Sequence, residues 1–149
     1  MIGCYSCRMN AAGADLPPRE RVYDDGRWRV AHALSSTLPG WLVVLPKRHI
    51  TSLAELTPAE AAALGPLLRR LSAALAEVTG CAKTYVALFA EAEGFEHLHF
   101  HVVPRVPDLP ADRRGPGIFA YLAKEESDWL PEPERDRLAA AVSTVMTER

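Results

Sequence analysis

The chain has 149 residues, a formal net charge of −2 and a sequence pI near 6.2. This charge excludes a strongly basic surface, so nucleic acid is not an expected partner. The apolar runs are shorter than the roughly 20 residues needed to cross a bilayer. The N-terminal "MIGCYSCRMN" has no hydrophobic core of a signal peptide. We therefore expect a cytoplasmic protein without membrane contact, whose three cysteines are thiols or metal ligands rather than disulfides.

Turn signals and short apolar runs predict five strands. Asp24-Asp25-Gly26 marks a hairpin turn that divides residues 21–33 into two strands. After Pro39-Gly40, the run "WLVVLP" (41–46) predicts a buried strand closed by a proline. Two more strands are expected at 83–90 and 96–105.

One long helix is predicted between the third and fourth strands. Thr57 as N-cap, Pro58 at the first helical position and Glu60 form a capping box, and Gly80 is a natural stop. Leucines between these ends keep helical spacing. A terminal helix is expected over 133–146, after a loop that begins past residue 105.

These elements favour an α+β fold: a mostly antiparallel five-stranded sheet with one long inserted helix and a C-terminal helix. The length fits a single domain, residues 1–149, with residues 106–149 as a C-terminal extension of uncertain structure.

The segment "EHLHFHVVPR" (96–105) places His97, His99 and His101 at alternate positions. Successive side chains of a strand point to opposite faces, so the intervening Leu98, Phe100 and Val102 are expected in the core. Solvated histidines, metal chelation and covalent catalysis by imidazole could each explain the other face. Periodicity alone does not separate the last two.

The motif "HLHFHVV" resembles the signature of the histidine triad superfamily of nucleotide hydrolases and transferases. "PGWLVVLPKRHI" (39–50) resembles a second segment of that family, and the order of helix and strands agrees. The resemblance implies that His99 is the nucleophile on the α-phosphorus of a nucleotide, forming a covalent nucleotidyl-histidine. It implies that His101 assists as a donor beside the phosphate, with no catalytic metal required.

Other nucleotide contacts are expected from the same resemblance. Gly94 belongs to the loop before the triad, where the family holds phosphate. Trp41 replaces a histidine of many members, and is either a core residue or a residue that stacks on the base.

"CYSC" (4–7) alone is weak evidence, compatible with a redox pair, half a zinc site or two small core residues. The zinc-bearing branch of the triad family has such a pair near its N-terminus. The resemblance implies a structural zinc held by Cys4, Cys7, His49 and His97. Two thiolates and two imidazoles make a closed tetrahedral site.

The chain also departs from the family pattern. Ala33 stands where a ribose-binding Asp is expected, so a charged acceptor for the sugar is missing. The loop "FAEAEGFEH" (89–97) has no hydroxyl or amide side chain to assist the leaving group. Its glutamates would either face the site and repel a polyphosphate or point to solvent.

The expected function is hydrolysis at the α-phosphate of dinucleoside polyphosphates or nucleoside phosphoramidates. The alternatives are a zinc-stabilised nucleotide-binding module with little turnover, and a nucleotidyltransferase or phosphorylase. A homodimer is also expected, because relatives pair their long helices and edge strands and the helix after Thr57 is apolar over a wide arc.

Overall fold

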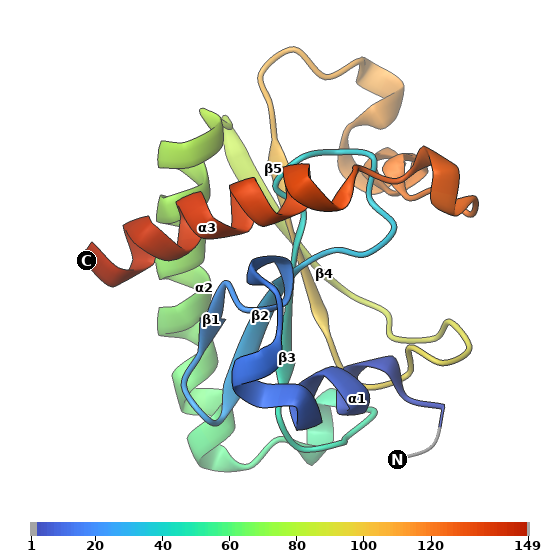
Figure 1. Cartoon of the computed structure of the whole chain (residues 1–149). Coiled ribbons are helices and arrows are strands. Elements are labelled where there is room, and N and C mark those ends of the chain that lie inside the picture. Colours follow the sequence, from blue (N-terminus) through green and yellow to red (C-terminus); the bar gives the residue numbers. More distant parts are fainter. Residues whose placement is uncertain (1–2, 149) are drawn as a thin grey trace.

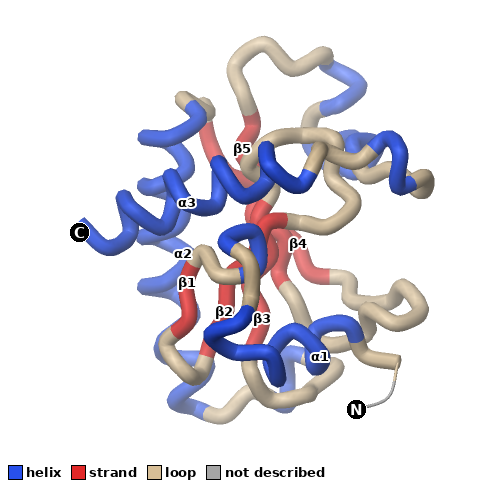
Figure 2. The backbone as a smooth tube through the Cα atoms, viewed as in Figure 1, coloured by secondary structure: helices blue, strands red, loops and turns tan. Residues whose placement is uncertain are grey.

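The computed structural model describes residues 3–148 and confirms the α+β fold. Every strand pairing is antiparallel, in the order β1-β2-β3-β5-β4. The strands are β1 (Tyr23–Asp24), β2 (Trp28–His32), β3 (Leu42–Pro46), β4 (Lys83–Leu88) and β5 (Phe100–Arg105). Figure 2 shows them at the centre of the molecule, with α2 (Pro58–Thr79) to one side.

Helix α2 begins and ends where the sequence predicts. The Thr57 hydroxyl accepts from the Glu60 amide, the Glu60 carboxylate accepts from the Thr57 amide, and Gly80 adopts a left-handed conformation at the C-cap. The Glu60 carboxylate also binds Arg48, whose contact lowers the pKa of Glu60 to about 2. The helix start is thereby tied to the turn after β3. Within residues 3–148, no helix is long and apolar enough to span a bilayer.

The terminal helix α3 (Glu132–Glu148) confirms the predicted one and packs against α2, as Figure 1 shows. Ala139, Val142 and Met146 of α3 join the leucines of α2 and the buried residues of the sheet in one core. Part of the wide apolar arc of α2 is thus covered within the same chain.

The opposite face of the sheet carries a second, smaller core. Trp41 and Val103 pack there against Leu109 and Ile118, which follow the last strand. The segment expected as a loop instead contains short 3-10 helices at Ala111–Arg113 and Gly115–Tyr121. Such short helices bury single side chains, so the apolar residues of this segment show no regular period from which the helices could be predicted.

A short N-terminal helix, α1 (Tyr5–Ala12), was absent from the sequence prediction. Cys4 is its N-cap, and the Cys4 sulfur accepts from the Cys7 amide at 3.3 Å. Ser6 is the one buried residue of this helix, so the helix has no apolar stripe. Without such periodicity the helix leaves no signal in the sequence.

His32, without an assigned role in the sequence, joins β2 to the turn before β3. Its Nδ1 donates to the Ala33 carbonyl at 3.0 Å, and its Nε2 accepts from the Gly40 amide at 3.0 Å. Burial lowers the pKa of His32 to about 4. The neutral ring therefore satisfies two backbone groups.

Replacing Thr57 by Ala should lower the free energy of unfolding by about 1 kcal/mol, because the amide at the third helical position loses its acceptor. Thr144→Ala is the matched control, since its hydroxyl only bonds the Ala140 carbonyl of its own helix. Urea denaturation of both variants makes the comparison. Equal stability of Thr57→Ala and wild type would show that the cap contributes nothing.

Stability should fall as pH decreases from about 6.5 to about 4, because unfolded His32 binds a proton in this range and folded His32 does not. The contribution has a limiting slope of about 1.4 kcal/mol per pH unit. We expect His32→Gln to lose less stability than wild type between pH 7 and pH 5, measured by urea denaturation. Parallel curves for the two proteins would contradict this assignment.

Candidate functional site

The first two histidines of the triad lie before strand β5. β5 starts at Phe100, so His97 and His99 lie on the extended approach to it, a correction to the strand expected from residue 96. The alternation itself holds, because Leu98, Phe100 and Val102 are all buried in the main core. The rings of His99 and His101 lie 5.0 Å apart between centroids. The two imidazoles are therefore near neighbours.

A backbone carbonyl determines the tautomer of the neutral His99 ring. Its Nδ1 lies 2.8 Å from the carbonyl oxygen of His97, which can only accept. Nδ1 therefore carries the proton in the neutral ring. The lone pair of His99 is left on Nε2, the nitrogen on the other side of the ring.

His101 has the opposite tautomer because of Trp41. The indole Nε1–H can only donate, and it lies 3.0 Å from His101 Nδ1. Nδ1 must therefore accept, and in the neutral ring the proton is on Nε2. Burial lowers the pKa of His101 to about 4, so the ring is neutral near pH 7.

Trp41 is fully buried, with 0% exposure, and its ring packs edge-on against Phe119. A ring with no exposed face cannot stack on a base. This burial favours the alternative of a core residue over the expected contact with a nucleotide base. Its specific contribution is the hydrogen bond that orients His101.

Cys4, Cys7, His49 and His97 come together, as the resemblance implied. Their sulfur and imidazole nitrogen atoms all lie within 4.8 Å of one another. The two cysteines come from the start of α1, His49 from the turn after β3, and His97 from the approach to β5. These four residues are a candidate Cys2His2 metal site.

The surroundings of His97 suit a ligand. Its Nε2 donates to the Pro46 carbonyl at 2.7 Å, which leaves Nδ1 facing the sulfurs of Cys4 and Cys7 at 3.7 and 3.6 Å. Metal-binding histidines commonly fix their second nitrogen in this way. Burial, with His49 and His99 nearby, lowers the pKa of His97 and favours the neutral, ligating form.

A cavity of about 610 Å³ lies beside the triad. His99 and His101 line it together with Ala33, at the place where the missing acid was expected. Gly94 is not among its lining residues; the Gly94 carbonyl instead accepts from the Tyr5 amide at 3.3 Å. The structure therefore gives Gly94 a contact with α1.

The three glutamates of the loop before the triad are all exposed to solvent. Glu91 lines the cavity, whereas Glu93 and Glu96 do not. Of these three glutamates, Glu91 is therefore the one placed to meet a bound phosphate. Phe89, which is 65% exposed, lies at the cavity and contacts Phe119 with 5.3 Å between ring centroids.

Several cavity residues were missed from the sequence. Phe119 contacts the His101 ring at 5.1 Å between centroids and belongs to the C-terminal segment. Tyr5, Glu20 and Arg29 line another part of the cavity. Glu20 and Arg29 are buried charged residues, a rarity that only the folded chain can reveal.

Comparison with known proteins agrees with these features. An uncharacterized HIT-like protein of Mycobacterium tuberculosis is 28% identical over 104 residues, covering 68% of this chain and 70% of that protein. The structure of a histidine triad protein of Sinorhizobium meliloti superposes with a TM-score of 0.67 at 26% identity, over 83% of this chain and 86% of that one.

A zinc-bound histidine triad family protein of Mycobacterium smegmatis has the same fold, with a TM-score of 0.66 at 20% identity over 98% of this chain and 97% of that chain. The HIT domain matches residues 17–108, more than half of the sequence and the part that holds the triad. The chain therefore belongs to the HIT domain family.

Proposed function

We propose that the protein hydrolyses nucleotides at the α-phosphate, acting on dinucleoside polyphosphates or nucleoside phosphoramidates. The observation that carries this proposal is the pair of opposite tautomers beside the cavity. His99 has a free lone pair on Nε2, and His101 has an N–H on its Nε2. A nucleophile next to a neutral hydrogen-bond donor suits attack on a phosphate with developing negative charge.

In this mechanism His99 Nε2 attacks the α-phosphorus, and the P–O or P–N bond to the leaving group breaks with its electron pair on that group. His101 Nε2–H donates to a phosphate oxygen. Water then displaces His99, which releases the nucleoside monophosphate and restores the imidazole. The two hydrogens of the water end on the leaving group and on the phosphate product.

The metal cluster fits zinc. Two sulfurs and two imidazole nitrogens are the ligand set of closed structural sites, which leave no position for water. Cys4, Cys7, His49 and His97 would hold the ion, and each already has a position fixed by α1, the turn after β3 or the Pro46 carbonyl. Bound there, zinc would supply folding free energy.

The alternative of a binding module with little turnover has one observation in its favour. Residues 89–96 contain no hydroxyl or amide side chain to donate a hydrogen bond to a leaving group, and Glu91 lines the cavity. We expect substrates with good leaving groups to be preferred. Gly94 would contribute at most its backbone to the phosphate. Transfer to phosphate in place of water is a further alternative with the same first step.

We also propose a single HIT-like domain that forms a homodimer. β4 is an edge strand with an unpaired side, and Val86 on it is 48% exposed. Edge strands of this kind are ready sites for pairing with another chain. Leu64 and Leu68 on α2 remain only partly buried after α3 has packed.

His99→Ala should reduce turnover by at least about a thousandfold, because the covalent step loses its nucleophile. Fold and metal content should be unchanged, since the core side of the segment is intact. Mass spectrometry after brief mixing with substrate should show a nucleotidyl adduct on wild type and none on the variant. Normal turnover by His99→Ala would exclude this mechanism.

Cys7→Ser should lose bound zinc and stability together. A loss of about 3 kcal/mol would lower Tm by roughly 6–12 °C for a chain of this size. Cys81→Ser is the matched control, because Cys81 lies outside the metal cluster. Metal analysis and thermal unfolding give the result. A native protein free of zinc and equally stable would refute the structural metal.

Sedimentation at micromolar concentration should give twice the chain mass of 16.3 kDa. Val86→Glu should produce monomers, because it places a charge on the proposed β4 interface. Leu53→Glu changes a similarly exposed apolar residue elsewhere on the surface and should leave the dimer intact. A wild-type monomer would count against the proposal.

A further inference from the structure

The triad shares one face of the sheet with a buried arginine. Arg29 pairs with Leu45 across β2 and β3, and continuing the β3–β5 ladder by one residue places Leu45 opposite His99. Arg29 on β2, Leu45 on β3 and His99, one residue before β5, therefore lie in one row. With strands about 4.8 Å apart, the backbones of Arg29 and His99 are separated by roughly 10 Å.

The surface between these ends is small and apolar. Ala31 and Ala33 follow Arg29 at alternate positions of the second strand, and Val43 precedes Leu45 in the same way on the third. All four line the cavity. A nucleotide with its phosphate at His99 can therefore extend flat across them, toward Arg29.

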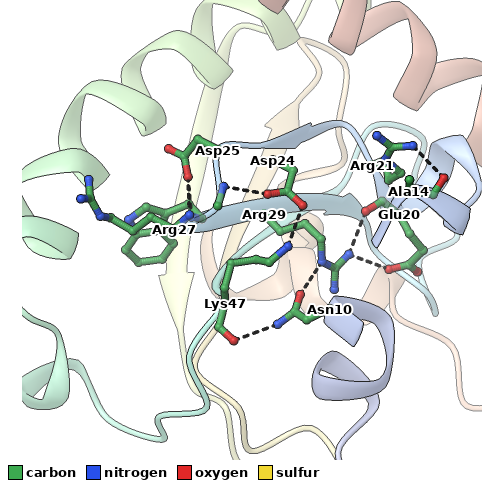
Figure 3. A network of polar contacts seen from close by, with 11 residues as sticks. Asn10, Ala14, Glu20, Arg21, Asp24, Asp25, Arg27, Arg29 and Lys47 are labelled. Atoms are coloured by element: carbon green, nitrogen blue, oxygen red, sulfur yellow. Dashed lines mark hydrogen bonds and ion pairs between the residues drawn. The ribbon is translucent and has the colours of Figure 1, made fainter. Parts of the chain in front are cut away.

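A buried polar network lies around Arg29, at the end of this surface away from His99. Arg29, 1% exposed, donates to the Glu20 carboxylate at 3.0 Å and the Glu20 carbonyl at 2.8 Å, and its Nε donates to Asn10 at 2.7 Å. Figure 3 shows this guanidinium between Glu20 and Asn10. The Tyr5 hydroxyl donates to the second carboxylate oxygen at 2.6 Å. Glu20 is thus held from two sides.

Glu20 retains capacity for a ligand. A carboxylate accepts about four hydrogen bonds, and Arg29 and Tyr5 supply one to each oxygen. Burying an ion pair adds little net stability compared with an apolar pair, so its place in a cavity wall favours a binding role. Glu20 is 4% exposed and lines the cavity beside Tyr5 and Arg29.

Resting on the proposed nucleotide function, we propose that Glu20 selects the base of the substrate, and that the preferred base presents two adjacent N–H donors, as guanine does. The N1–H and the N2 amino group of guanine would each donate to one carboxylate oxygen. Arg29 and Tyr5 orient the carboxylate for this contact.

Other bases complement the carboxylate less well. Adenine places a lone pair at N1 beside its amino group, and that lone pair would oppose an oxygen of Glu20. Uracil offers a single N–H between two carbonyl oxygens. Hypoxanthine retains N1–H and lacks the N2 amino group, so it differs from guanine by one donor. Inosine monophosphate is therefore the sharpest comparison.

The test is calorimetric titration of wild-type protein with guanosine and inosine monophosphates, which requires no turnover. We expect guanosine monophosphate to bind at least tenfold more tightly, a difference of 1.4 kcal/mol. Glu20→Gln should reduce the ratio to about twofold or less. Glu93→Gln, an exposed change outside the cavity, should retain the wild-type ratio.

Glu20→Gln leaves Arg29 without its charge partner, so the variant could fail to fold. The double variant Glu20→Gln with Arg29→Gln removes both charges and should also lose selectivity. Equal binding of the two nucleotides by wild type, or undiminished selectivity in a folded Glu20 variant, would overturn this inference and leave the proposed function standing. Binding of neither nucleotide would overturn this inference alone, because a protein selective for another base would still hydrolyse its own nucleotides.

Discussion

His97 joins the candidate metal site to His99. Its Nδ1 faces the two cysteine sulfurs, its Nε2 donates to the Pro46 carbonyl, and its own carbonyl accepts from His99 Nδ1. The Pro46 carbonyl therefore orients the His97 ring, and the His97 carbonyl in turn sets the tautomer of His99. A displacement of this backbone would change the nitrogen available on His99.

The rest of the site depends on parts of the chain that are distant in sequence. α1 brings Cys4, Cys7 and Tyr5 to the approach of the histidine strand, so the proposed metal site and the proposed base site share one helix. Residues between the two cysteines contribute to the cavity wall. We expect the metal to order the cavity as well as the fold, because its ligands flank that wall.

The C-terminal segment completes the site from the other side. Phe119 contacts the rings of Trp41, Phe89 and His101, although it lies beyond the residues that match the HIT domain. This packing contributes to the burial that lowers the pKa of His101. The same segment forms the second core with Trp41. The surroundings of the triad thus include a residue outside the part that matches the HIT domain.

The sequence by itself determined the strand order along the chain, the long helix with its caps, and the triad at period two. These are local patterns: the capping box at Thr57 and the alternation of Leu98, Phe100 and Val102 need only neighbouring residues to specify them. The resemblance to the histidine triad family added the four metal-site residues, which the fold brings together.

Only the tertiary structure decided which partner each polar group finds. Trp41 was open between core and base contact until its burial and its bond to His101 were seen. Helix α1, the wall formed by Phe119 and the Glu20–Arg29 pair have no periodic signature. Each exists because segments far apart in the chain pack together, and the energy of a buried hydrogen bond or ion pair depends on that packing.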